Sequence, residues 1–412
     1  MTGGARTDTL TGRIGELTAS RSETNRRFFE AEAERLARCC HAMAERFARG
    51  GRLIALGHSP VARSDARHVA VEFVHPVIVG KRALPAIGLA GEGGELDAQL
   101  AVLAEPDDIV IGYTATADDA PQARAALALA RERGCQTIAF APAGAEWEFE
   151  VSEDDPFIDQ EVVETLYHVL WELVHVFFDH RGLLEGREAG PVHDTGGSAF
   201  LYPFLSESEH DLDSVVDDVR RSVLLKSEEV GALREATLGE NAETLIAVAR
   251  ELRARLERGG RLLAFGNGGS ATDAMDAVAD FRHPPQGWPT RAAIDLTEDS
   301  SILTAIANDI GVEEIFQRQV IAYGRPEDAA LALSTSGGSD NVILALDEAR
   351  RRGLVTVALV GYDGGRIAAE GLADHVIVTR SQHIPRIQEA QASAYHVLRE
   401  LVELVGAPVD DD

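Results

Sequence analysis

Short, uninterrupted apolar stretches alternate along this chain with longer amphipathic ones. Between residues 261 and 380 the apolar stretches are RLLAFG, RAAIDL, AALALS, VTVALV and HVIVTR. Helical patterns separate them, such as NVILALDEARRRG, which ends at Gly353 as helices commonly do. Strands without polar alternation, separated by helices, are typical of a parallel sheet that is covered on both faces. The pattern therefore predicts an α/β fold.

The same succession occurs twice in the chain. ERFARGGRLIALGHSP at 45–60 matches ARLERGGRLLAFGNGG at 254–269, and further on YHVLWELV matches YHVLRELV. A repeat of roughly two hundred residues is too long for a solenoid and indicates two copies of one domain. We predict two three-layer α/β/α domains, at 1–205 and 212–408. Their boundary is expected in the acidic stretch LYPFLSESEHDLDSVVDD.

The acidic composition of the chain limits the kinds of partner that it can bind. Lys and Arg number 39 against 68 Asp and Glu, which gives a formal net charge of −29. Such a chain repels nucleic acid and anionic membranes, so we expect neither as a partner. The sparse cysteines Cys39, Cys40 and Cys135 show no metal-ligand spacing and favour a reducing compartment. Since no window approaches ~18 apolar residues, we predict a cytoplasmic protein without a membrane span.

The loop that follows the stretch RLLAFG carries the first sign of function. It continues as Asn267-Gly-Gly-Ser270 straight into an Ala-rich helix. In parallel α/β sheets, ligands bind beyond the carboxyl ends of the strands. A Gly-rich turn there exposes backbone N–H groups, and the following helix directs its positive end at an anion. Taken alone, this loop is equally well explained by tight packing.

A second loop favours phosphate. The stretch AALAL runs into STSGGSDNV, which places four hydroxyl groups beside two glycines at another strand end. A helix N-cap needs one such hydroxyl, not four. The dinucleotide pattern G-x-G-x-x-G is absent, which argues against a nicotinamide cofactor. We expect sugar phosphate to be bound by Asn267, Gly268, Gly269, Ser270, Ser334, Thr335, Ser336 and Ser339.

These motifs match a known family. The chain resembles a tandem of SIS (sugar isomerase) domains, and its second half resembles the phosphoheptose isomerases. The resemblance rests on GNGGSATDAM, AIDL, ANDIG, STSGGSDNV and RIQEAQASAYHVL. It implies a flavodoxin-like five-stranded parallel sheet in each domain, a bound sugar phosphate, a divalent metal that is usually zinc, and sites formed between SIS domains. On that basis we expect a homodimer with four SIS domains, in which Asp295, Asn308 and Gln388 contact the sugar.

The family's metal-binding positions are divided between the two halves. The family has His and Glu four residues apart on the helix after the Gly-rich loop, and Gln and His eight apart on the last helix. In the first half all four match and are the expected metal ligands: His68, Glu72, Gln160 and His168. In the second half the same positions are Asp276, Asp280, Gln388 and His396.

The residue types suit the expected chemistry. Positions i and i+4 share one helix face, so His68 and Glu72 can reach a common ion, and such ligands suit zinc. The competing interpretation is that these histidines only pack in the core. The phosphate loops show the opposite division: the first half keeps Ser59, Thr114 and Thr116 but lacks the glycines. One working site that draws on both halves explains complementary losses, and two separate sites are the alternative.

Isomerisation between an aldose and a ketose moves one proton between carbons and another between oxygens. By resemblance, Glu72 or Asp280 is the base and His168 or His396 the acid. We predict conversion of sedoheptulose 7-phosphate to glycero-manno-heptose 7-phosphate. Two alternatives remain: a non-catalytic regulator that senses a sugar phosphate, and an interaction protein like the replication-initiator-associating SIS protein.

Overall fold

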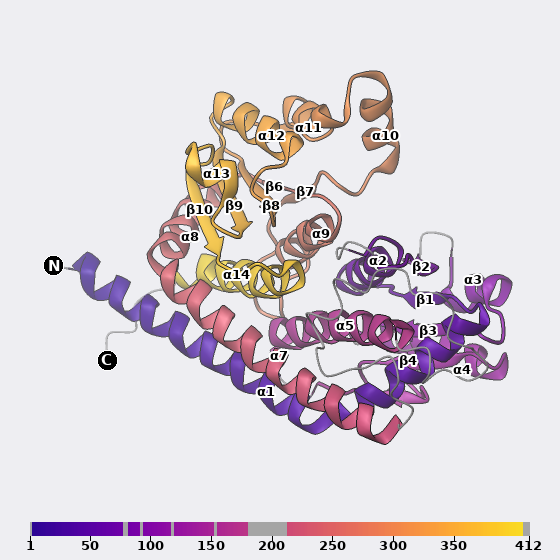
Figure 1. Cartoon of the computed structure of the whole chain (residues 1–412). Helices are drawn as coiled ribbons and strands as arrows, with labels where there is room; N and C mark the ends of the chain where they lie inside the picture. Colours follow the sequence, from indigo (N-terminus) through magenta and orange to yellow (C-terminus); the bar gives the residue numbers. More distant parts are fainter. Residues whose placement is uncertain are drawn as a thin grey trace. The chain divides into compact units, whose positions relative to one another are not determined.

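The computed structural model describes residues 2–76, 81–90, 94–116, 119–151, 155–179 and 212–406 (Figure 1). The chain forms two compact units. The first unit is Thr24–Glu229, and the second combines Met1–Glu23 with Val230–Asp412. Most of the predicted domain boundary, residues 201–211, lies outside the described residues.

The first unit contains a five-stranded parallel sheet in the order β2-β1-β3-β4-β5. In register, Leu56 at the end of β1 pairs with Gly112 at the end of β3. Helix α2 begins at Pro60, whose missing N–H is harmless in a first turn, and the Ser59 hydroxyl accepts a hydrogen bond from the Ala62 N–H. The elements are α1 (Thr2–Arg49), β1 (Leu53–Leu56), α2 (Pro60–Val74), β2 (Ala86–Leu89), α3 (Leu96–Leu103), β3 (Ile109–Gly112), α4 (Asp119–Glu132), β4 (Gln136–Ala139), β5 (Trp147–Glu148) and α5 (Pro156–Asp179).

The second unit repeats this sheet in the order β7-β6-β8-β9-β10, again with parallel neighbours. All five strands fall on the apolar stretches that the sequence indicates. The elements are α7 (Leu212–Glu240), α8 (Ala242–Glu257), β6 (Leu262–Phe265), α9 (Gly269–Arg282), β7 (Ala293–Asp295), α10 (Ser300–Asp309), η2 (Val312–Glu314), α11 (Gln317–Tyr323), β8 (Ala329–Ser334), α12 (Asp340–Arg351), β9 (Val355–Gly361), α13 (Gly365–Ala369), β10 (His375–Thr379) and α14 (Ile384–Leu404).

Both faces of each sheet are covered, as the absence of polar alternation predicts. On β6, Leu262 and Ala264 belong to the hydrophobic core that α8, α9 and α14 complete. The intervening residues Leu263 and Phe265 belong to a separate core, which includes residues of α11 and α12. The predicted fold, two flavodoxin-like parallel sheets flanked by helices, is confirmed.

The compact units do not coincide with the predicted domains, because α1 and α7 each contribute residues to both units. The first 23 residues of the chain belong to the second unit, and residues 212–229 of α7 belong to the first. The physical reason is burial: Leu10, Ile14 and Leu17 of α1 lie in the core of the second unit and are at most 7% exposed. In addition, Arg21 Nη2 lies 2.8 Å from Glu400 Oε1 of α14, and both side chains are buried.

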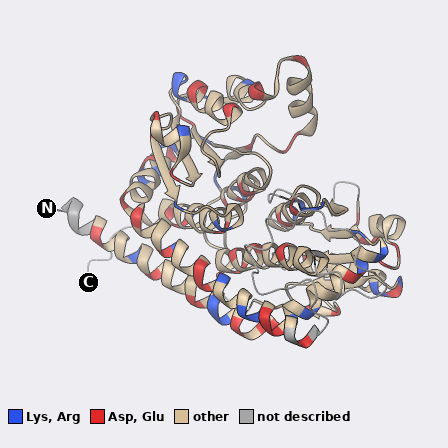
Figure 2. Cartoon of the chain, viewed as in Figure 1, with Lys and Arg blue, Asp and Glu red and all other residues tan. Residues whose placement is uncertain are grey.

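Acidic and basic residues are interspersed along α1 (Figure 2). Many form ion pairs one turn apart, such as Arg26 with Glu30 and Arg38 with Glu34. Both pairs are solvent-exposed, so each contributes at most ~0.5 kcal/mol to stability. Among the residues that the structure describes, no helix is long and apolar enough to cross a membrane.

Candidate functional site

The two predicted phosphate loops lie side by side at one edge of the second sheet. Strand β6 lies between β7 and β8, and the chain leaves it in one direction toward β7 and returns on the other side at β8. The carboxyl ends of β6 and β8 therefore border the point where the strand order reverses, which is where open α/β sheets bind ligands. Residues 266–270 follow β6, and residues 335–339 follow β8.

Glycines are required in both loops. A Cβ on Gly266 would lie 2.4 Å from the carbonyl oxygen of Ser270, so no larger residue fits the turn. Gly337 has φ +59°, and a Cβ there would lie 2.3 Å from the carbonyl oxygen of Gly364. Gly268 also has φ +59° but has open space around it, so its requirement is conformational.

The hydroxyl groups of the two loops differ in burial and in the hydrogen bonds that they make. Ser334 is buried, and its Oγ accepts a hydrogen bond from the Gly337 N–H at 3.2 Å, so it shapes the loop. Ser336 is exposed, and its Oγ accepts from the Gly338 N–H at 3.2 Å. Ser339 is the N-cap of α12 but makes no side-chain capping hydrogen bond. Thr335 is half-buried and Ser270, in the first turn of α9, is buried.

A pair of amide side chains joins the two loops. Asn267 Nδ2 donates to Asn341 Oδ1 and Asn341 Nδ2 donates to Asn267 Oδ1, both at 2.9 Å. Asn267 is one of the expected phosphate ligands, and in this structure its side chain ties the two loops together. Asn341 was missed by the sequence interpretation, although it lies within the quoted motif STSGGSDNV.

Helices α9 and α14 bring the predicted acid and base of the second half together. Asp280 Oδ2 lies 3.5 Å from His396 Nε2, and both side chains are at most 4% exposed. The ring of Tyr395 lies edge-on against that of His396, with centroids 4.6 Å apart. A buried imidazole beside a carboxylate is an arrangement that can exchange protons with a substrate.

Arg399 holds the end of α9 in place. Its guanidinium donates a hydrogen bond to the backbone carbonyl of Asp280 at 3.1 Å. It also lies 5.0 Å from the ring centroids of both Phe281 and Trp288. Glu403 Oε1, at 2.7 Å, neutralises its charge. The sequence interpretation did not identify this residue, because its contacts with Asp280, Phe281 and Trp288 join segments more than 100 positions apart.

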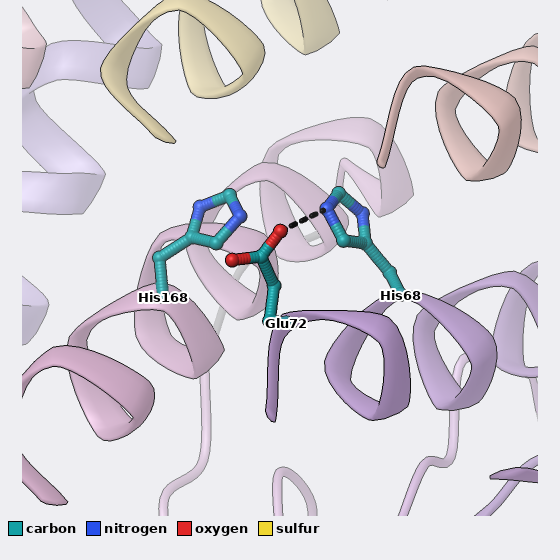
Figure 3. A group of neighbouring side chains, drawn as sticks. All are labelled: His68, Glu72 and His168. Atoms are coloured by element: carbon teal, nitrogen blue, oxygen red, sulfur yellow. Dashed lines mark ion pairs between the residues drawn. The ribbon is translucent and has the colours of Figure 1, made fainter. Parts of the chain in front are cut away.

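In the first unit, three of the four predicted metal ligands converge. His68, Glu72 and His168 come from α2 and α5 and point toward one another (Figure 3). One ligand atom from each lies within 4.8 Å of the others, and all three side chains are buried. His68 Nε2 lies 3.9 Å from Glu72 Oε1. Two imidazoles and a carboxylate are a donor set suited to zinc or another borderline divalent ion.

Tyr167 orients the imidazole of His68. The Tyr167 hydroxyl is 2.8 Å from His68 Nδ1, which leaves Nε2 directed at Glu72. Burial, followed by the proximity of His168, holds the pKa of His68 well below its usual range. His68 is therefore neutral near pH 7, which is the form that binds a metal. In both copies of YHVL a tyrosine directly precedes the histidine, and this repeat is the sequence feature that could have pointed to Tyr167.

The other predicted site residues occupy varied surroundings. Gln160 lies two turns before His168 on α5 and is buried, and its Nε2 has no hydrogen-bond partner among the described residues. Asp276 and Gln388 are buried on α9 and α14. At the end of β7, Asp295 accepts hydrogen bonds from the backbone and hydroxyl of Thr297. Asn308 is exposed on α10 and donates to its neighbour Asp309.

These features define a protein with two flavodoxin-like domains, of which the second has phosphate-type loops at its switch point. The family model of the SIS domain matches residues 227–361. The phosphoheptose isomerase of Nitratidesulfovibrio vulgaris is 40% identical over 190 residues, which is 46% of this chain and 90% of that protein. That of Chlorobium phaeobacteroides is 46% identical over 175 residues, 42% of this chain and 76% of that protein.

The tandem arrangement has a structural counterpart. The C-terminal domain of glucosamine-fructose-6-phosphate aminotransferase from Francisella tularensis matches 95% of each chain with a TM-score of 0.60. At 9% identity this likeness shows the fold alone. The chain belongs to the SIS-domain family, and part of it is homologous to phosphoheptose isomerases.

Proposed function

We propose that this protein is a phosphosugar aldose–ketose isomerase that converts sedoheptulose 7-phosphate to glycero-manno-heptose 7-phosphate. The observation that carries the proposal is the combination of features in the second unit. It combines two phosphate-type loops at a switch point with a buried His396–Asp280 pair, in a chain 40% identical to a phosphoheptose isomerase over 190 residues. An alternative SIS function, sensing a sugar phosphate without turnover, is favoured by Asp276 and the shorter Asp280, where the family has His and Glu.

The reaction needs two proton movements. A base removes a proton from C1 of the ketose to give the enediol, and a proton then returns to C2 while a hydroxyl proton passes from O1 to O2. A carboxylate suits the carbon proton and an imidazole suits the oxygen proton. In the second half these groups are Asp280 and His396, and in the first half Glu72 and His168.

A divalent metal fits the first-half residues. His68, Glu72 and His168 would hold it, with Gln160 as the fourth proposed ligand, and zinc is the metal that the donor set favours. Such an ion stabilises negative charge on an enediolate oxygen. Tyr167 and the buried surroundings keep His68 oriented and neutral for that role.

The test is direct. The purified full chain is incubated with sedoheptulose 7-phosphate, with added zinc and after treatment with a chelator, and aldoheptose phosphate is measured. We expect product with zinc and a large loss after chelation. Tight binding of the ketose without product in either condition would favour the sensing function instead.

We also propose a homodimer, since the family builds its sites between SIS domains and this chain carries two. Light scattering on the purified protein at micromolar concentration should give twice the chain mass of 44.3 kDa. A monomer under those conditions would contradict the proposal.

A further inference from the structure

The loops of the first unit that correspond to the phosphate loops are joined by a carboxylate. Asp119 is 1% exposed at the start of α4. Its Oδ1 accepts a hydrogen bond from the Ser59 N–H at 2.6 Å. Its Oδ2 accepts from the Thr116 N–H at 2.8 Å and from the Thr116 hydroxyl at 3.0 Å.

Part of this arrangement is ordinary helix capping. An acidic residue in the first turn that reaches back to the N–H of Thr116 makes one of the two bonds of a capping box. The bond from Ser59 goes further, since it joins Asp119 to the other loop, 60 residues away, at the start of α2. The carboxylate therefore takes donors from both loops at once, as a bound oxyanion would.

The strand registers identify the matching residues of the second unit. Leu56 pairs with Gly112 in the first sheet, and Phe265 pairs with Ala332 in the second. Counted from these ends, Ser59 corresponds to Gly268 and Thr116 to Ser336. Asp119, the first residue of α4, matches the start of α12, where Ser339 is the N-cap and Asp340 the first helical residue. Gly268, Ser336 and Ser339 are expected phosphate ligands, so the Asp119 carboxylate lies at the helix start where the second unit has a proposed phosphate-binding hydroxyl.

The side chains that join the loops are retained in another form. Gln122 Nε2 lies 3.2 Å from His58 Nε2, and His58 corresponds to Asn267, which pairs with Asn341. In the first unit, too, side chains join the two loops, and the N–H groups of Ser59 and Thr116 that could receive an anion are used internally. A second anion there would meet the Asp119 charge and find its donors occupied.

We infer that Asp119 is a built-in occupant of the first unit's oxyanion site, so that this unit binds no sugar phosphate at its sheet edge. Each chain then binds one sugar phosphate, at the loops of the second unit. This inference rests on the proposed function for the second site. The Asp119 contacts make the first unit selective against the very ligand that its fold would otherwise accept.

The first experiment counts sites in the full chain by calorimetry. We expect one sedoheptulose 7-phosphate per chain in the parent protein, and loss of that site in a background carrying Ser336→Ala and Ser339→Ala. Two sites per chain in the parent protein, or a site that persists in this background and is abolished by Thr116→Val, would overturn the inference.

The second experiment opens the first unit and uses inorganic phosphate as the probe. In the same background, Asp119→Ser removes the carboxylate and supplies the hydroxyl found at Ser339. We expect phosphate binding to become tighter by about tenfold, equivalent to one charge-assisted hydrogen bond. Asp119→Asn, which keeps the size and removes the charge, provides a second variant if the serine variant unfolds. A folded variant with no gain in phosphate binding would contradict the inference.

An error in the proposed function would give a different experimental result from an error in the role of Asp119. If the parent chain binds no sugar phosphate and shows no turnover, the second-unit site is wrong. A gain of phosphate binding on replacing Asp119 would still support its role in the first unit.

Discussion

At the scale of single residues, Glu403 gathers three arginine side chains around one carboxylate. Its carboxylate accepts hydrogen bonds from Arg253, Arg291 and Arg399, at distances of 2.7 to 3.3 Å. Burial alone would raise the pKa of Glu403, but the hydrogen bonds from Arg291 and Arg399 hold it below its usual value of 4.5. The same cluster positions the backbone of Asp280 through Arg399.

The lowered pKa of Glu403 predicts a dependence of stability on pH. The unfolded state binds the proton more readily than the folded state, so the contribution of Glu403 is present above pH 4.5 and is lost as pH falls through the lowered pKa. Thermal unfolding should therefore show a shallower acid-side loss in Glu403→Gln than in the parent chain. Glu257→Gln, at an exposed carboxylate that also pairs with Arg253, is the matched control. Parallel acid profiles for Glu403→Gln and the parent chain would contradict this account.

At the scale of elements, the loop of residues 334–339 separates hydroxyls that shape the fold from those available to a ligand. Ser334 holds the loop through Gly337, whereas Ser339 makes no capping bond. Substitutions at the exposed end of the loop should therefore affect binding more than folding.

We predict that Ser336→Ala with Ser339→Ala weakens sugar-phosphate binding by a few kcal/mol, because each hydrogen bond to a charged group contributes ~1.5–3 kcal/mol. Calorimetry with sedoheptulose 7-phosphate measures the loss, and the melting temperature should change little. Unchanged affinity in the double variant would remove this loop from the site.

Helix α1 contributes to the second unit through its N-terminal segment, and this has a measurable consequence. Leu17→Ala should destabilise the second unit by about 2–5 kcal/mol, because the side chain is 4% exposed in its core. Leu225→Ala is the matched control, since Leu225 is 61% exposed and its truncation should cost little. Equal denaturant midpoints for the two variants would show that this segment is not part of the folded core.

The fold was predictable from the sequence where local patterns decide it. The strands follow from apolar runs such as AALALS, and Gly353, at φ +85°, lies just beyond the end of α12 as predicted. The convergence of His68, Glu72 and His168 was expected from the resemblance to the family's metal-binding positions, and helical spacing placed His68 and Glu72 on one face. Asn341, Arg399 and Asp119 were missed because their roles depend on contacts between segments far apart in the chain. The sharing of α1 was missed because one continuous helix carries no local sign of which core it enters.

At the scale of the whole molecule, the two copies of one fold carry different sets of candidate site residues. The first unit holds the convergent imidazoles and carboxylate, and an internal carboxylate joins its loops. The second unit holds the Gly- and Ser-rich loops and the His396–Asp280 pair. If this division reflects one activity, turnover should require groups from both halves.

The most direct measurement is the turnover of sedoheptulose 7-phosphate by Glu72→Gln, alongside His396→Ala, with metal content and ligand affinity determined on the same samples. The account predicts that Glu72→Gln loses turnover by at least ~100-fold, as expected on removing a catalytic base or a metal ligand, while the affinity for sugar phosphate survives. His396→Ala should also lose turnover. If metal content falls in Glu72→Gln yet isomerisation continues at the parent rate, the residues of the first half are structural and the claim that both halves serve one activity is wrong.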